Sequence, residues 1–313
     1  MNWLSVHSLS RRETLICVTG ALLFLTATAL CIGLRPEHLL ITGLFVALFF
    51  AAPATRRLAV ALLPFVLFGI SYDWMRLIPN YEVNPIDTRP LYEAERALFG
   101  ITVDGQRIIP GAFFNTHHWA VADFLAGVFY LCWVPVPIAF GLWLYFSGRR
   151  CHYLRFAFAF LFVNLLGFTF YYVHPAAPPW YVLNYGFEPV VSTPGNVAGL
   201  ARFQELTGLY VFDHLYSKNA NIFAAVPSLH AAYMLIAFIY AIVSRQRRAL
   251  IVLFAVITIG IWGTAVYTCH HYIIDVLLGI AFALVGVVFF EWGLLRFPPI
   301  ARFARRYQQY IGG

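Results

Sequence analysis

Charged side chains are scarce in this sequence. Asp, Glu, Lys and Arg together make up 11% of the 313 residues, whereas hydrophobic residues make up 61%. Water-soluble domains average about 25% charged and about 45–50% apolar residues. So little charge cannot cover the surface of a water-soluble domain, which indicates that lipid solvates most of the chain.

Cysteine is also scarce, and its pattern excludes two kinds of site. The five cysteines lie far apart and form no Cys-x-x-Cys pair, which argues against a disulfide framework and a cysteine metal site. The acidic residues do not cluster at metal-ligand spacing either, so we expect no metal and no cofactor. Low-complexity tracts, internal repeats and an appended soluble domain are absent from the sequence.

Long hydrophobic runs are what the sequence does contain. A helix needs about 20 apolar residues to cross about 30 Å of hydrocarbon. We assign eight such segments, at residues 14–34, 38–52, 57–78, 120–147, 154–173, 228–244, 249–267 and 271–293. They predict an all-α, polytopic membrane helix bundle of about eight transmembrane helices in one integral membrane domain, residues 1–313. The second segment is short, and a re-entrant course there would leave seven. The first is too long for a signal peptide, whose apolar stretch covers about 7–15 residues.

The basic residues agree with this topology. With the N-terminus in the cytoplasm, the cytoplasmic segments hold most of them: Arg11, Arg12, Arg56, Arg57, Arg149, Arg150, Arg155, Arg245, Arg247, Arg248, Arg296, Arg302, Arg305 and Arg306. Short loops rich in Lys and Arg stay in the cytoplasm. We therefore expect cytoplasmic termini and a basic tail at 296–313. The net charge of +7 then reflects two opposed membrane faces and not nucleic-acid binding.

Two long loops lie on the opposite, outer side in this topology. They cover residues 79–119 and 174–227, and their length makes them candidate functional loops. Polar groups at membrane depth are costly and usually have a purpose. Those at the predicted span ends all fall on this outer side: Asp73, Arg76, Asp123, His174, Ser228, His230, His270, His271 and Asp275. We therefore expect a functional site there.

His271 and Asp275 are the first candidates for chemistry. They are four residues apart, so a helix would place them on one face. A carboxylate that accepts a hydrogen bond from one ring nitrogen fixes the tautomer and leaves the other nitrogen free as a nucleophile or base. The pair also opens the last predicted span, and a helix N-terminus favours an anion such as phosphate. A structural His–Asp pair at a helix end is the alternative.

Ser228 and His230 open the sixth predicted span. Pro227 suits the first turn of a helix, which places His230 in the opening turn. Ser228 can cap this helix or donate its hydroxyl to a phosphate oxygen, and His230 can serve as a general acid. An ordinary helix start with an interfacial histidine is the alternative.

A proline-rich turn, His174 to Tyr181, follows the fifth predicted span. Its prolines end the helix, and Trp180 and Tyr181 suit an anchoring turn at the membrane interface. We also include His174 and Tyr181 among the candidate substrate-binding residues.

Taken together, these elements resemble the type 2 phosphatidic acid phosphatase superfamily, and within it the inositol phosphorylceramide synthase branch. The matching motifs are Pro-Ser-Leu-His-Ala at 227–231, Cys-His-His-Tyr-Ile-Ile-Asp at 269–275 and Ala-Pro-Pro-Trp-Tyr at 177–181. The resemblance covers roughly residues 120–295 and reaches weakly into 72–76. It implies a bundle with a six-helix phosphatase-like core. We assign the catalytic helical region to 120–295, preceded by the spans and outer loop of 1–119.

The resemblance implies a role for each catalytic residue. His271 would attack phosphorus and form a phosphohistidine intermediate, and Asp275 would orient and support it. His230 would protonate the departing lipid oxygen and then take a proton from the acceptor hydroxyl. The partners implied are a phosphatidylinositol-like donor, which would give up its phospho-head group and leave diacylglycerol, and a ceramide-like acceptor. The resemblance assigns no partner subunit.

The sequence departs from the phosphatase pattern where that pattern has cations. Thr264 and Ala265 stand where a Ser-Arg pair precedes the histidine, and Gly167 stands where a lysine precedes His174. An anionic transition state still needs compensation. The candidates are His174, His270, Arg76 and Arg202, and we favour Arg76, held against Asp73 on the same helix. A site with few cations suits a phosphodiester, which carries one negative charge, better than a phosphomonoester.

Two other functions are considered for the same residues. In a lipid phosphatase, water would replace the lipid acceptor, and the departures from the phosphatase pattern count against it. A transporter would use Asp73, Asp123 and Asp275 as an ion path, but it needs polar residues at the membrane midplane, whereas these lie on one side. We expect a bacterial inner-membrane enzyme whose site faces the periplasm.

Overall fold

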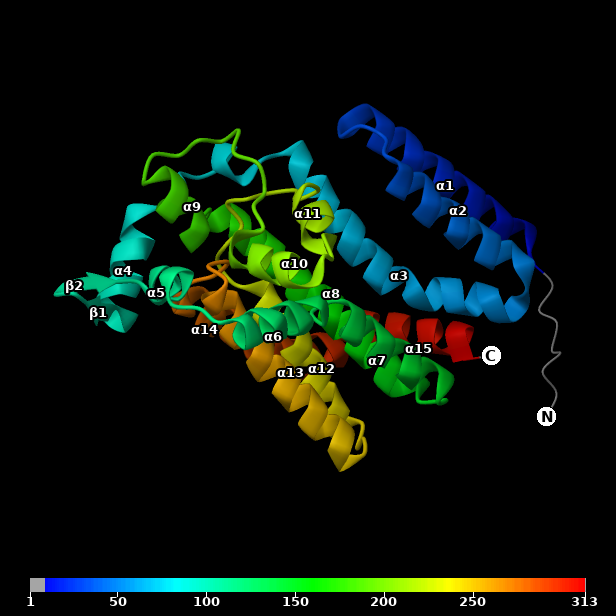
Figure 1. The fold of residues 1–313 in the computed structure, drawn as a ribbon. Helices are drawn as coiled ribbons and strands as arrows, with labels where there is room; N and C mark the ends of the chain where they lie inside the picture. Colours follow the sequence, from blue (N-terminus) through cyan, green and yellow to red (C-terminus); the bar gives the residue numbers. More distant parts are fainter. Residues whose placement is uncertain (1–8, 313) are drawn as a thin grey trace.

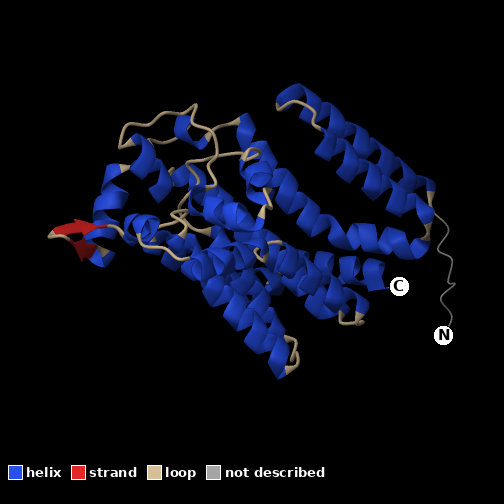
Figure 2. Cartoon of the chain, in the orientation of Figure 1, coloured by secondary structure: helices blue, strands red, loops and turns tan. Residues whose placement is uncertain are grey.

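The chain folds almost entirely into helices (Figures 1 and 2). The computed structural model describes residues 9–312. Within that range the only sheet is a hairpin of β1 (Ile101–Val103) and β2 (Gln106–Ile108), paired antiparallel with Thr102 opposite Arg107. The predicted all-α class is confirmed.

Each predicted hydrophobic segment is helical. The helices are α1 (Arg11–Cys31), α2 (Pro36–Ala51), α3 (Pro53–Trp74), α6 (Ala120–Leu131) with α7 (Pro135–Phe146), α8 (Arg150–Val173), α12 (Leu229–Val243), α13 (Arg248–Tyr267) and α14 (Ile273–Trp292). Five of them, namely α1, α3, α8, α13 and α14, are long and apolar enough to cross a membrane, and α6 with α7 would form a sixth span. Helices α2 and α12 are apolar but shorter. The chain is therefore an integral membrane protein.

The fourth predicted span is bent. Helices α6 and α7 meet at 44° across a short break. Pro135 begins α7, and a proline has no N–H to continue the hydrogen-bond ladder of the preceding helix. The break places Trp133 beside α12, where its ring stacks on Tyr233 with centroids 5.3 Å apart.

Helix α12 lies at the centre of the bundle, packed against α8, α13 and α14. Two glycines permit these close approaches. A Cβ on Gly279 of α14 would lie 2.1 Å from the carbonyl oxygen of Ser228, so glycine lets the start of α12 rest against α14. A Cβ on Gly167 of α8 would lie 2.6 Å from Leu229 Cδ2. The position at which the phosphatase pattern has a lysine is thus filled by the side chain of Leu229.

Short helices gather at one end of the bundle, here called the loop end (Figure 1). They are α4 (Arg89–Phe99), α5 (Pro110–Thr116), α9 (Pro179–Tyr185), α10 (Ala201–Thr207) and α11 (Val211–Tyr216), with 3-10 turns at Met75–Leu77, Asn80–Glu82 and Ala198–Leu200. Isolated parallel bridges join Asp87 to Ala176 and Ala176 to Ala224. These bridges tie the two predicted long loops into one cover over the ends of α8, α12 and α14.

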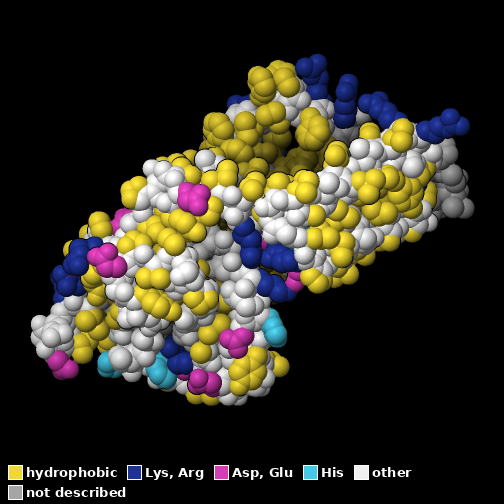
Figure 3. Space-filling model, turned by 90° about the horizontal axis from the view of Figure 1, so that it is seen from above, with side chains coloured by type: hydrophobic (Ala, Val, Ile, Leu, Met, Phe, Trp, Pro, Cys, Tyr) yellow, Lys and Arg dark blue, Asp and Glu magenta, His cyan; other side chains and the backbone are white. Residues whose placement is uncertain are grey.

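The α1–α2 hairpin and the C-terminal helix lie at the side of the bundle. The hairpin packs on α3, and its side chains Leu15, Leu22 and Leu23 are 60–66% exposed. Figure 3 shows hydrophobic side chains over much of the surface of the α1–α2 hairpin, as expected for a surface in lipid. After a 3-10 turn at Leu294–Arg296, α15 (Pro298–Gly312) carries the basic tail and packs against α3 and α8.

Candidate active site

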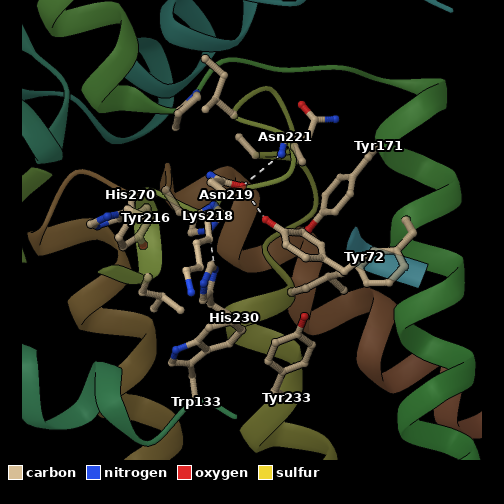
Figure 4. Close-up of a pocket in the computed structure, with 18 of the residues that line it drawn as sticks. Tyr72, Trp133, Tyr171, Tyr216, Lys218, Asn219, Asn221, His230, Tyr233 and His270 are labelled. Atoms are coloured by element: carbon tan, nitrogen blue, oxygen red, sulfur yellow. Dashed lines mark hydrogen bonds between the residues drawn. The ribbon is translucent and has the colours of Figure 1, made fainter. Parts of the chain in front are cut away.

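A cavity of about 220 Å³ lies at the loop end, between the ends of α3, α8 and α12. Three histidines line it, namely His230, His270 and His271. Figure 4 labels the first two. Much of the remaining wall is aromatic, formed by Tyr72, Trp133, Tyr171, Tyr216 and Tyr233 among others. The cavity therefore combines a lipid-compatible wall with a small number of polar groups, as ligand sites usually do.

His271 lies in the turn between α13 and α14. The turn is fixed because the backbone N–H groups of His270 and His271 both donate to the carbonyl of Ala265, at 3.0 and 2.9 Å. His271 Nδ1 lies 3.4 Å from Asp275 Oδ2, and the same carboxylate oxygen accepts the Tyr272 N–H at 2.9 Å. Asp275 is fully buried. The predicted His–Asp pairing across one helical turn is thus present.

His230 comes from the first turn of α12 and meets His271 directly. Its Nδ1 lies 3.0 Å from His271 Nε2, and its Nε2 lies 3.0 Å from the hydroxyl of Tyr130. An ionised carboxylate can only accept hydrogen bonds, so the hydrogen between His271 and Asp275 belongs to His271 Nδ1. This choice fixes the donor in each of the other contacts. His271 donates from Nδ1 to Asp275, His230 donates from Nδ1 to His271, and Tyr130 donates to His230 Nε2.

The nitrogen expected to act as the nucleophile, His271 Nε2, is therefore not free in the resting site. We expected the Asp275 contact to leave His271 Nε2 unoccupied, but His230 holds it. A phosphorus atom can approach Nε2 only after this contact opens. With phosphorus between the two rings, His230 would lie on the side opposite His271 Nε2, from which the leaving oxygen departs, and this suits proton transfer to that oxygen.

Tyr130 was not found from the sequence. It is completely buried in α6, and its hydroxyl also bonds to the hydroxyl of Tyr216. One tyrosine in an apolar helix carries no local signal of this kind. The contact depends on packing between α6 and α12, which lie 100 residues apart at this point.

Glu95 changes the expectation for the N-terminus of α14. We expected the free N–H groups there to bind phosphate. Instead Glu95 of α4 is buried against them and accepts the N–H of Ile273 at 2.8 Å and of Ile274 at 3.2 Å. Burial raises the pKa of Glu95 above the ordinary range of glutamate. The helix start is thus occupied by a carboxylate of the chain itself.

Ser228 serves as the N-cap of α12. Its hydroxyl oxygen accepts the Ala231 N–H at 3.4 Å, and its own N–H donates to the carbonyl of Asp275 at 2.9 Å. Its side chain is fully buried. Of the two roles considered for Ser228, the structure shows the cap, and this cap joins the starts of α12 and α14.

His270 lines the cavity but does not supply a positive charge. Its Nδ1 lies 2.9 Å from the Thr268 hydroxyl. Burial, followed by the neighbouring His230 and His271, lowers its pKa well below the ordinary range of histidine. The ring is therefore neutral at physiological pH in the resting site.

The structure places Arg76 and Arg202 in ion pairs away from the cavity. Arg76 lies 3.3 Å from Asp73 and donates to the carbonyl of Lys218. Arg202 donates to the buried Asp123 at 2.6 Å. Neither arginine is among the described residues that line the cavity.

His174 and Tyr181 also lie outside the cavity wall. His174 Nε2 is 3.3 Å from Asp87 Oδ2 in a partly exposed pair. Tyr181 is buried, donates to the carbonyl of Glu188 at 2.9 Å and accepts the Val190 N–H at 2.6 Å. The adjacent Trp180 lines the cavity instead, and its backbone N–H donates to the carbonyl of Cys269 at 3.0 Å. This turn therefore fixes the segment that carries the histidines.

Lys218 is the cation that the sequence interpretation overlooked. Among residues 9–312, it is the only Lys or Arg that lines the cavity. A signal did exist, because Lys218 is the only lysine in the sequence and follows an aromatic stretch in the second long loop.

Within residues 9–312, no group of three or more His, Cys, Asp or Glu residues could hold a metal ion.

We expect the acidic limb of the kcat/KM profile to lie near pH 4. Burial lowers the pKa of His271 to about 4, so Nε2, the nitrogen expected to be the nucleophile, keeps its lone pair across the physiological range and loses it as the pH falls through about 4. Donor-dependent kcat/KM measured from pH 3.5 to 8 checks this, with recovery of activity after return to pH 7 as the control for unfolding. A limb centred near 6.5 would contradict the assignment.

Two histidines in contact, with a buried carboxylate behind one of them, line a cavity of this helical membrane bundle, and such a pair suits acid, base or nucleophilic catalysis. The family model of the PAP2 superfamily matches residues 90–289, and the chain belongs to this superfamily. The resemblance found in the sequence motifs is thereby confirmed.

Characterised relatives support the same placement. A phosphoinositol dihydroceramide synthase from Bacteroides thetaiotaomicron is 62% identical over 302 residues, which cover 96% of this chain and 99% of the relative. The inositol phosphorylceramide synthase catalytic subunit of Schizosaccharomyces pombe is 27% identical over 81% of this chain and 58% of its own length. The inositol phosphorylceramide synthase of Candida albicans is 27% identical over 80% of this chain and 51% of its own length. No solved structure matches the chain significantly.

Proposed function

We propose that this protein transfers phosphoinositol from a glycerophospholipid to the hydroxyl of a ceramide-like lipid and releases diacylglycerol. The observation that carries the proposal is the continuous contact from Asp275 through His271 to His230 at the wall of an aromatic cavity. The extensive identity to a phosphoinositol dihydroceramide synthase supports the choice of head group and acceptor.

The first half of the reaction would form a phosphohistidine. The anionic phosphodiester enters between the two histidines and favours the protonated form of His230. His271 Nε2 attacks phosphorus, the bond from phosphorus to the diacylglycerol oxygen breaks, and His230 gives its Nδ1 proton to that oxygen. Asp275 holds the Nδ1–H of His271 and stabilises the positive charge that develops on the ring.

The second half would reverse these roles. The acceptor hydroxyl replaces diacylglycerol beside the intermediate, and His230, now neutral, takes its proton. The acceptor oxygen attacks phosphorus and the bond from phosphorus to nitrogen breaks, which restores both histidines. Aromatic side chains around the cavity favour a lipid acceptor over water.

The charge of the site supports a phosphodiester as the donor. Leu229 fills the position next to Gly167 where the phosphatase pattern has a lysine, and Ala265 offers only its backbone carbonyl where that pattern has an arginine. One cation at the cavity matches the single negative charge of a diester better than the nearly double charge of a monoester.

The proposed placement in the membrane follows from the basic residues. The loop end carries the site and would face the periplasm of a bacterial inner membrane, with both termini in the cytoplasm. The concentration of arginine in the loops at the opposite end supports this. The division into N-terminal spans at 1–119, a catalytic core at 120–295 and a tail at 296–313 stays a prediction.

Product formation by the purified protein tests the proposal. In mixed micelles with inositol-labelled phosphatidylinositol, we expect a labelled phosphoinositol-ceramide only when ceramide is present, together with an equal amount of diacylglycerol. The same donor without ceramide is the control. Release of inositol phosphate at the same rate with and without ceramide would identify a hydrolase and contradict the transferase.

A further inference from the structure

The proposed reaction brings an anion to a site with few permanent cations. A phosphodiester in a cavity with apolar walls needs a positive charge nearby, because its interaction with that charge is stronger there than in water. The arginines near the loop end are committed elsewhere, since Arg76 pairs with Asp73 and Arg202 with Asp123. His270 is neutral in the resting site. These facts leave Lys218 among the described residues that line the cavity.

The backbone at Lys218 is held by the end of α3. Arg76 donates to the carbonyl of Lys218, and the Tyr72 hydroxyl donates to Asn219 Oδ1. Asn219 Oδ1 also accepts the Asn221 N–H at 3.1 Å, which closes the turn. The loop thus presents the lysine from a fixed point, and Lys218 forms part of the cavity wall (Figure 4).

The ammonium group, by contrast, has a partner that it can leave. It forms an ion pair with Glu37 in the first turn of α2. The two side chains are 56% and 39% exposed, and an exposed pair of this kind is weak and competes with solvent. A four-carbon stem with three rotatable donors can turn from Glu37 to a phosphate oxygen without moving the backbone.

We infer that Lys218 binds the phosphodiester of the donor lipid, and that Glu37 is its counter-ion in the resting site and releases it when the donor arrives. The inference rests on the proposed function for the identity of the donor. It also assigns a role to the α1–α2 hairpin, which lies before the matched region of the superfamily (residues 90–289) and still reaches the site through Glu37.

Three variants and one control test the inference in mixed micelles with phosphatidylinositol and ceramide. Lys218→Met should lower donor kcat/KM about 100-fold, the range found when one donor to a developing oxyanion is removed, and leave the acceptor KM unchanged. Lys218→Arg keeps the charge and should stay within about tenfold of the wild type. Glu37→Gln should lower the donor KM several-fold, because the lysine no longer has a competing carboxylate. Arg96→Gln removes an exposed charge paired with Glu93 on α4 and should change neither constant.

A binding measurement separates this inference from the proposed function. In His271→Ala protein, which cannot turn over, retention of labelled phosphatidylinositol should weaken at least tenfold on addition of Lys218→Met, and retention of neutral ceramide should not change. A wild-type protein that makes no phosphoinositol-ceramide would contradict the proposed function. The binding test would still show whether Lys218 binds the phosphodiester. Equal donor binding with and without the lysine, or a Lys218→Met kcat/KM within threefold of the wild type, would overturn the inference.

Discussion

Replacing His271 by alanine is expected to lower lipid transfer by roughly 10⁵-fold or more, because loss of a catalytic nucleophile removes the covalent route altogether. The structure supports this role by its geometry. His271 Nδ1 faces Asp275, so Nε2 is the nitrogen with a lone pair, and it is directed at His230 beside the cavity. No other described side chain repeats this combination of a buried carboxylate and a cavity-facing nitrogen.

The covalent intermediate gives this prediction a direct measurement. Incubation with inositol-labelled donor in the absence of ceramide should leave an acid-labile label on the wild-type protein, and addition of ceramide should discharge it into product. His271→Ala should take up no label. His117→Ala is the matched control and should label normally, because His117 is an exposed histidine that stacks on Phe113 at the start of the α5–α6 connection. A labelled His271→Ala protein would place the nucleophile elsewhere.

Replacing His230 by glutamine is expected to lower transfer about 10³-fold with a natural donor, within the range that a positioned acid contributes. A diacylglycerol alkoxide is a poor leaving group, so its departure needs the proton that His230 Nδ1 would carry. The glutamine keeps hydrogen-bonding atoms near Tyr130 and His271 but cannot deliver a proton at neutral pH.

The leaving group of the donor distinguishes an acid from a merely structural residue. With a nitrophenyl ester of inositol phosphate as donor, the departing oxygen needs little protonation, and His230→Gln should retain activity within about tenfold of the wild type. Transfer to ceramide is followed with both donors in the same micelles. An equal loss with both donors would indicate that His230 only positions its neighbours.

Much of the architecture could be predicted because it depends on local composition. The helices at α1, α3, α8, α13 and α14 follow from runs of apolar residues that bury backbone hydrogen bonds in lipid. The bend between α6 and α7 was missed, although Pro135 marks the position at which the hydrogen-bond ladder cannot continue. Here a local signal was present, but the apolar composition on both sides concealed it.

The contacts of the candidate site also divide into local ones that the sequence predicts and long-range ones that it does not. The pairing of His271 with Asp275 and the capping role of Ser228 were predictable, because both depend on spacing within one helix turn. Glu95 and Tyr130 were not predictable, since Glu95 reaches the start of α14 and Tyr130 reaches His230 from helices far away in the chain. Arg76 illustrates the same limit. Its pairing with Asp73 three residues away was foreseen, but the structure directs it to the Lys218 carbonyl and not to the cavity.

The sequence by itself thus determined a helical membrane protein with a histidine and carboxylate pair, and its motifs pointed to the PAP2 superfamily. Tertiary structure alone decided that His230 closes on His271 across 41 residues, that Glu95 occupies the helix start expected to hold phosphate, and that Lys218 is the cation at the cavity. The physical reason is the separation along the sequence between the residues that interact. Helix formation and pairing within a turn depend on neighbours in the chain, whereas contacts between side chains of distant segments depend on how the helices pack and how the outer loops cover their ends.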